Sequence, residues 1–154
     1  MSTTCETTAA FTCFNREGLA TLLPHQGSAL RKIDGVFLNK ANPTFITGMK
    51  KIEPGDPDLD GHFPGAPTYP GYAQDEFTCL TAAALVLYLN DGLERNPHVV
   101  QKVCRYKRAV SPGDTLRAEV VLKSRRSRFF HFSAEIRNQH EEIVAEYEKI
   151  VGVL

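Results

Sequence analysis

Apolar and polar residues alternate regularly over much of the second half of this chain. The alternation is clearest along residues 116–123 and 130–137, and residues 99–108 and 143–153 have a similar strand-like composition. A Ser-Pro-Gly-Asp turn signal at 111–114 separates two of these segments. Alternation with a period of two is typical of antiparallel strands with one face in the core. The pattern therefore predicts four antiparallel strands in this half.

The first half of the chain is less regular. Residues 1–15 read as a polar lead-in that we expect to be flexible, and residues 16–23 favour a short helix. Residues 33–52 are strand-like, with an Asn-Pro turn signal at 42–43 that divides them. Together with the second half, these segments predict a sheet of five or six antiparallel strands.

One long helix is predicted between the two strand regions. Residues 72–89 contain neither Gly nor Pro, and residues 82–87 are apolar on every face of a helix. A helix that is apolar all round must be buried all round, and Gly92 suits a left-handed cap at its end. A curved antiparallel sheet wrapped around one central helix satisfies both patterns. We therefore predict an α+β fold in which residues 16–154 form a single domain.

The overall composition excludes several functional classes. Among the 154 residues, 18 Lys and Arg balance 18 Asp and Glu, so the formal net charge is zero. A general nucleic-acid binder needs excess positive charge, so we do not expect that function. The Cys and His residues lack zinc-ligand spacing, and no apolar stretch is long enough to span a bilayer. We expect a cytoplasmic protein without a metal site.

Residues 53–71 combine five prolines and four glycines, so no long regular element is expected there. His62 lies in this loop, and histidine is the usual general base near neutral pH. Gly71 opens the predicted helix, where a free N–H can stabilise an oxyanion. Glu76 follows on the first turns, where burial would raise its pKa and make it a candidate general acid. On pattern alone, such a His and such a Glu are more often structural.

The same segment carries a long and specific motif. It reads Gly61-His62-Phe63-Pro64-Gly65-x-Pro67-x-x-Pro70-Gly71, with a carboxylate, Glu76, fourteen residues after the His. This motif closely resembles that of the (3R)-hydroxyacyl-[acyl-carrier-protein] dehydratases, which are hotdog-fold enzymes. Residues 102–114 are similar to the basic strand and Pro-Gly-Asp turn of that family. The resemblance extends over roughly residues 20–153 and implies a hotdog fold with one helix at its centre.

The resemblance also implies a reaction and its residues. The family's catalytic His falls on His62 and its acid on Glu76, and the two act across a dimer interface, one from each subunit. His62 would remove a C2 proton from a 3-hydroxyacyl thioester, and the Gly71 N–H would stabilise the enolate-like oxygen. Glu76 would protonate the departing hydroxyl, so that water leaves and a trans-2-enoyl thioester remains.

The resemblance implies further contacts and partners. The acyl group would lie in a tunnel beside the helix, and the expected substrate-binding residues are Phe63, Pro70, Tyr72 and Leu80. The substrate would arrive on the phosphopantetheine of an acyl carrier protein, so no other cofactor is expected. The expected assembly is a homodimer or a trimer of dimers.

The chain departs from the family pattern at several positions. Tyr72 replaces a smaller apolar residue, Leu80 stands where the family usually has Gln, and Asp75 offers a rival to Glu76. The loop at 54–60 is also more acidic than the family's. These changes suggest a substrate of secondary metabolism. Two alternatives stay open: a hotdog thioesterase that directs water at the same carbonyl, and a non-catalytic synthase subunit that binds the carrier protein.

Two basic clusters are candidates for docking an acidic carrier protein, which needs local positive charge even where the net charge is zero. One contains Lys102, Arg105 and Arg108, which we predict as the docking residues. The other occupies residues 123–128. Solvated strand faces and a hairpin tip would explain both clusters equally well.

Overall fold

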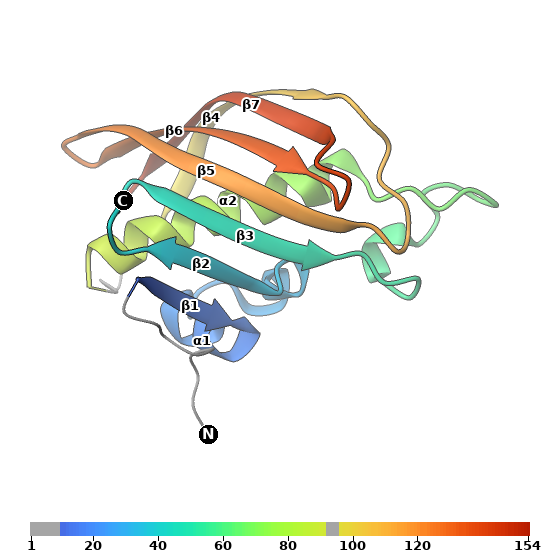
Figure 1. The fold of residues 1–154 in the computed structure, drawn as a ribbon, viewed down its shortest axis with the longest axis horizontal. Helices are drawn as coiled ribbons and strands as arrows, with labels where there is room; N and C mark the ends of the chain where they lie inside the picture. The colour runs from blue at the N-terminus through green and yellow to red at the C-terminus, as the bar shows by residue number, and fades with distance from the viewer. Residues whose placement is uncertain (1–9, 92–95) are drawn as a thin grey trace.

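A computed structural model of the chain describes residues 10–91 and 96–154. The elements follow in this order: β1 (Phe11–Asn15), α1 (Arg16–Leu22), η1 (Gly27–Lys32), β2 (Gly35–Asn39), β3 (Phe45–Lys51), η2 (Pro57–Leu59), α2 (Gly71–Leu89), β4 (His98–Tyr106), β5 (Thr115–Arg126), β6 (Phe129–Arg137) and β7 (Ile143–Val153). The strands pair antiparallel in the order β1-β2-β3-β5-β6-β7-β4. This sheet curves around α2, as Figure 1 shows.

Helix α2 lies in the core because most of its faces are apolar. All six residues from 82 to 87 are buried, and its exposed side chains lie toward its two ends, at Tyr72, Tyr88 and Leu89. Pro70 caps the amino end with extended backbone angles, which a proline adopts without cost. The predicted central helix is confirmed within one residue at each end, whereas the expected cap at Gly92 lies outside the described residues.

The sheet supplies the other half of the core. In β5 and β6 the residues at alternate positions, such as Leu116, Val120 and Ile136, are buried, and their neighbours are more exposed. These inward side chains join those of α2 in one hydrophobic cluster. The predicted curved antiparallel sheet around one helix is therefore confirmed as an α+β hotdog architecture.

The sheet has one strand more than the five or six expected. Residues 11–15, assigned to the polar lead-in from the sequence, form β1 and pair with β2 from Phe11↔Asn39 to Asn15↔Gly35. Its Phe and Thr residues favour a strand, but the segment is only five residues long and follows a polar stretch, so its pairing with β2 shows the strand more clearly than its sequence does. Residues 1–9 lie outside the described part of the chain.

Helix α2 packs closely on β3 at a glycine. A Cβ at Gly48 would lie 2.1 Å from Oγ1 of Thr81, which is fully buried and donates its hydroxyl hydrogen bond to the Phe77 carbonyl. The helix can lie this near the strand only because position 48 has no side chain. The contact fixes the depth of α2 within the sheet.

Replacing Gly48 with alanine is therefore expected to lower the free energy of unfolding by about 1–3 kcal/mol, as overpacking of cores does. Urea unfolding measures this change. Gly55→Ala is the matched control, because nothing lies within 4 Å of its added Cβ. The double variant Gly48→Ala/Thr81→Ala should recover part of the loss. Equal effects at Gly48 and Gly55 would contradict this account of the packing.

Candidate active site

The loop before α2 is anchored by two buried ion pairs. Lys50 Nζ lies 3.0 Å from Asp56, and Lys32 Nζ lies 2.8 Å from Asp58, with all four side chains almost entirely buried. Lys50 also donates to the Arg31 carbonyl at 2.9 Å. The acidic residues that lengthen this loop therefore fasten it to η1 and β3. Breaking one partner of such a buried pair would leave an uncompensated charge.

Tyr72 extends this anchor to the first turn of α2. Its hydroxyl donates to Asp58 Oδ1 at 3.0 Å, and Lys32 Nζ lies 5.6 Å from the centre of its ring. Burial opposes the charge on Asp58, but hydrogen bonds from Lys32 and Tyr72 outweigh it, so the pKa of Asp58 lies below its ordinary value. Tyr72 is thus tethered although most of its surface is exposed.

His62 is held in one orientation by the loop that follows it. Its Nδ1 lies 2.8 Å from the Thr68 carbonyl, and its backbone carbonyl accepts from the Thr68 N–H at 2.7 Å. Because a carbonyl can only accept, Nδ1 carries a proton, and in the neutral imidazole Nε2 is then the nitrogen with the lone pair. The ring also stacks on Phe63, with centroids 4.1 Å apart. This tautomer is the one that a general base needs.

The loop that carries His62 projects from the rest of the molecule between η2 and α2, at the right of Figure 1. Phe63, the neighbour of His62, is largely exposed. The segment that carries His62 is thus set apart from the sheet that surrounds α2.

A cavity of about 610 Å³ runs along α2. Tyr72 and Leu80, two of the four residues predicted to bind the substrate, line it together with Glu76. Part of its wall is charged, with Arg31, Lys32, Asp75 and Lys102, and another part is formed by small and apolar residues: Ala82, Ala83, Val86, Phe132, Ile150 and Gly152. The other expected site residues, His62, Phe63, Pro70 and Gly71, are not among the described residues that line this cavity within one chain.

The two neighbouring carboxylates of α2 differ in their surroundings. Asp75 accepts hydrogen bonds from Tyr106 at 2.7 Å and Tyr147 at 2.9 Å, and it pairs with Lys102. Glu76 is half-buried at the cavity wall, and its carboxyl group has no hydrogen bond or ion pair with any residue in the described ranges. Glu76 is therefore the carboxyl group that remains available to a substrate, in agreement with the spacing of the motif.

Gly71 begins α2, and its N–H has no backbone acceptor among residues 10–91 and 96–154. The Ala73 and Gln74 N–H groups already donate to the Pro70 carbonyl, at 3.1 and 3.2 Å. An unused N–H at the positive end of a 19-residue helix suits a developing negative charge on oxygen.

Cys79 also lies in the wall of this cavity. Burial raises the pKa of its thiol to about 12, so it stays protonated at neutral pH. An acyl-enzyme on this thiol is not favoured.

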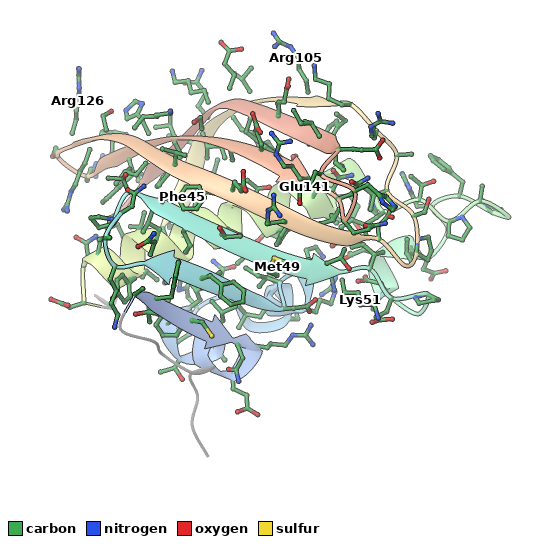
Figure 2. The ribbon with its side chains drawn as sticks, viewed as in Figure 1. Phe45, Met49, Lys51, Arg105, Arg126 and Glu141 are labelled. Carbon is green, nitrogen blue, oxygen red and sulfur yellow. The ribbon has the colours of Figure 1, made fainter. Side chains whose placement is uncertain are left out.

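The two basic clusters have different surroundings. Lys102 pairs with Asp75, Arg105 lies 3.7 Å from Glu148, and Arg108 lies 3.2 Å from Glu142. The cluster at 123–128 forms the β5–β6 hairpin, and none of its cations pairs with a carboxylate in the described part of the chain. In Figure 2, Arg126 extends from this hairpin away from the sheet.

Sequence reasoning missed several residues that shape this site. Tyr106, Tyr147 and Lys32 come from separate elements, and their contacts with the loop and helix span 26 to 72 residues of sequence. The unusual acidic loop and the rival Asp75 were the signals available. Neither of these two signals indicates which side chain, distant in sequence, contacts the acidic loop or Asp75.

A curved sheet around one helix, a cavity along that helix and an open carboxyl group on its wall define a hotdog-fold enzyme. Among solved structures, the chain is similar to the dehydratase heterocomplex ApeI:P from Xenorhabdus doucetiae, with a TM-score of 0.71, 14% identity, and coverage of 88% of this chain and 89% of that one. It is also similar to the E. coli PaaI protein from the phenylacetic acid degradation operon, with a TM-score of 0.62, 16% identity, and coverage of 90% and 89%. These two likenesses show the fold.

The sequence comparisons define the family. The profile of the ApeI-like family, described as ApeI dehydratase, matches residues 39–147. The chain is 31% identical over 127 residues to the 3-hydroxyacyl-[acyl-carrier-protein] dehydratase FabZ of Rickettsia typhi, covering 81% of this chain and 86% of that protein. It is 34% identical to the FabZ of Rickettsia massiliae, covering 80% and 85%. The protein belongs to the ApeI-like dehydratase family, and the resemblance drawn from the motif is confirmed.

No helix in the described ranges is both long enough and apolar enough to cross a membrane.

Asp58→Asn should destabilise the protein at pH 7 by about 3 kcal/mol, because Lys32 and Tyr72 would lose a buried ionised partner. The folded pKa of Asp58 is lowered, so its stabilising effect is complete above the ordinary Asp pKa of about 4. The effect is lost as the pH falls through the lowered folded value. Urea unfolding of both proteins between pH 7 and pH 3 measures the difference.

Glu53→Gln is the matched control, because its ion pair with Lys51 is largely exposed. We expect almost no change in stability from this substitution. A difference between Asp58→Asn and the wild type that stays constant from pH 7 to pH 3 would contradict the assignment.

Proposed function

We propose that the protein dehydrates a 3-hydroxyacyl group, held as a thioester on an acyl carrier protein, to the trans-2-enoyl thioester. The observation that carries this proposal is the pair of available groups. His62 donates from Nδ1 to the Thr68 carbonyl, which makes Nε2 the basic nitrogen of the neutral ring, and Glu76 is the open carboxyl group on the wall of the cavity along α2. The relatives named as 3-hydroxyacyl-[acyl-carrier-protein] dehydratases support the same chemistry.

The reaction needs one base, one acid and one oxyanion donor. His62 Nε2 takes the proton from C2, and the electrons of that C–H bond form the new double bond between C2 and C3. The Gly71 N–H stabilises the negative charge that develops on the thioester oxygen. Glu76 gives its proton to the C3 hydroxyl as the C3–O bond breaks, and water leaves. A proton then returns from His62 to Glu76, directly or through solvent, and no cofactor beyond the substrate's own phosphopantetheine is needed.

The site is proposed to form between two protomers. The His62 loop projects away from its own chain, and Glu76 lies on a cavity that no residue of this loop lines within the described part of one chain. The edge strand β4 also exposes three apolar side chains, at Val99, Val100 and Val103. Covering this strand with a second copy would bury them. A homodimer, alone or within a trimer of dimers, satisfies both requirements.

The cavity favours an apolar acyl chain. Leu80 and the small residues of α2 leave room beside the helix, while Tyr72 provides a fixed aromatic wall near the helix start. A large tethered ring at this position and an apolar residue at 80 support a substrate of secondary metabolism in place of the ordinary fatty-acid intermediates.

The carrier protein is proposed to dock on the basic side chains that have no acidic neighbour. Arg126 and Arg128 of the β5–β6 hairpin meet this condition in the described part of the chain, whereas Lys102, Arg105 and Arg108 each face a carboxylate of their own chain. An unneutralised cation contributes more to the attraction of an acidic partner than a paired one. The cluster on β4 is therefore the weaker of the two candidates.

Activity should be restored when two inactive variants, His62→Ala and Glu76→Gln, are unfolded, mixed and refolded together. Each mixed dimer has one intact site, with His62 from one protomer and Glu76 from the other. Random pairing makes half of the dimers mixed, so about a quarter of the wild-type activity is expected. Formation of the enoyl product from a 3-hydroxyacyl carrier protein is the measurement.

Each variant refolded alone is the control and should show no turnover. Two other results would refute the proposed function. Release of a free thiol without enoyl product would identify a thioesterase. Binding of the carrier protein by wild-type enzyme without turnover of 3-hydroxyacyl substrates of several chain lengths would identify a non-catalytic subunit.

The double variant Arg126→Ala/Arg128→Ala should raise KM for the carrier-bound substrate about fivefold to tenfold. KM for the same acyl group on free pantetheine should stay unchanged, because that substrate makes no carrier contact. Arg105→Ala is the matched control, since Arg105 is exposed but lies near Glu148. A larger effect from Arg105→Ala, or an equal loss with the pantetheine substrate, would place docking elsewhere.

A further inference from the structure

Asp75 collects hydrogen-bond donors from two strands at the edge of the sheet. Its Oδ1 accepts from the hydroxyls of Tyr106 on β4 and Tyr147 on β7, and its Oδ2 pairs with Lys102 of β4. The Asp75 side chain is only 14% exposed. Such a set of donors uses most of the accepting capacity of one carboxylate. Asp75 therefore joins the start of α2 to the strands beside it.

One of these donors lies directly against the helix start. A Cβ added to Gly71 would be 2.7 Å from Cζ and 3.0 Å from the hydroxyl oxygen of Tyr106. The ring of Tyr106 therefore packs on the Cα of Gly71, next to the N–H that the reaction requires. Tyr147 donates a hydrogen bond to the same oxygen of Asp75, but none of the three atoms nearest to the Cβ added at Gly71 belongs to Tyr147.

We propose that Asp75 is a positioning residue that, through Tyr106, holds Gly71 and its N–H in place for the thioester carbonyl. The inference rests on the proposed dehydration and assigns a role to the carboxylate that the reaction itself does not use. It also explains why two adjacent carboxyl groups occupy this turn. Glu76 exchanges a proton with the substrate, while Asp75 keeps the oxyanion donor aligned.

The chemistry of the cluster supports an anchor and argues against a proton donor. Hydrogen bonds to an ionised carboxylate are about twice as strong as those between neutral groups. Burial and the bond to Asp75 raise the pKa of Tyr106, so the phenol keeps its proton and continues to donate. β4 lies at the edge of the sheet, whereas several of the contacts between α2 and the sheet are made with β3 and β5. The hydrogen bond from Tyr106 to Asp75 is therefore one link between β4 and the helix.

The test compares four variants with the wild-type enzyme on a carrier-bound 3-hydroxyacyl substrate. Asp75→Asn and Tyr106→Phe should each lower kcat by about 10- to 100-fold, because misplacing a reacting group by about 1 Å has such an effect. KM should change by less than about threefold. The double variant should be no slower than the slower single variant, since both changes remove one interaction.

Tyr147→Phe is the matched control, because it removes a hydrogen bond to the same oxygen without the contact at Gly71. Its kcat should stay within about twofold of wild type, although its melting temperature should fall. The acid and base limbs of the pH profile of kcat should persist in Asp75→Asn.

Three results would overturn the proposal. Tyr147→Phe could lower kcat as much as Tyr106→Phe, which would indicate a purely structural cluster. The losses in Asp75→Asn and Tyr106→Phe could be absent or could multiply in the double variant. Asp75→Asn could abolish turnover together with one limb of the pH profile, which would make Asp75 the proton donor. If Asp75→Asn fails to fold, the comparison of Tyr106→Phe with Tyr147→Phe decides. Each of these outcomes leaves wild-type turnover intact, so failure here is distinct from failure of the dehydration itself.

Discussion

The burial of α2 determines where the chemistry of this protein can occur. Its second half has no polar face, so this part of the helix is stable only inside the curved sheet. The close contact between Gly48 and Thr81 then sets how deep the helix lies. With the apolar part fixed, the first turns, which carry Tyr72, Asp75 and Glu76, must lie at the boundary between core and solvent. The fold thus presents two carboxylates on the wall of the cavity along α2.

The loop before α2 must stay ordered although it projects from the rest of the fold. A projecting segment loses much conformational entropy when it is fixed, and prolines reduce that cost because they restrict the unfolded chain as well. The ion pairs Lys50–Asp56 and Lys32–Asp58 then hold the base of the loop, so that its tip can extend without becoming loose. The hydrogen bond between Nδ1 and the Thr68 carbonyl then fixes the orientation of the His62 ring within this loop.

Much of this arrangement could be predicted from the sequence, because it depends on local patterns. The period of two in β5 and β6 and the apolar run in α2 are determined by neighbouring residues, and the motif around His62 is contiguous. The short strand β1 was missed because its partner strand decides its structure. The site's polar contacts were missed for a related reason. Asp58 finds Lys32 and Asp75 finds Tyr147 only after the sheet has formed.

The choice between Asp75 and Glu76 shows where such local patterns fail. The two residues are adjacent on one turn of a helix and have similar side chains, so neither spacing nor propensity separates their roles. Their partners do separate them. Asp75 and Glu76 are the carboxylates among the described residues that line the cavity, and Asp75 is occupied by two phenols and an ammonium group. A carboxylate whose oxygens already accept hydrogen bonds has little capacity left for a ligand, whereas an open one can form a hydrogen bond with a bound hydroxyl. The reactivity of this turn therefore depends on which of its acids the folded sheet leaves without a partner.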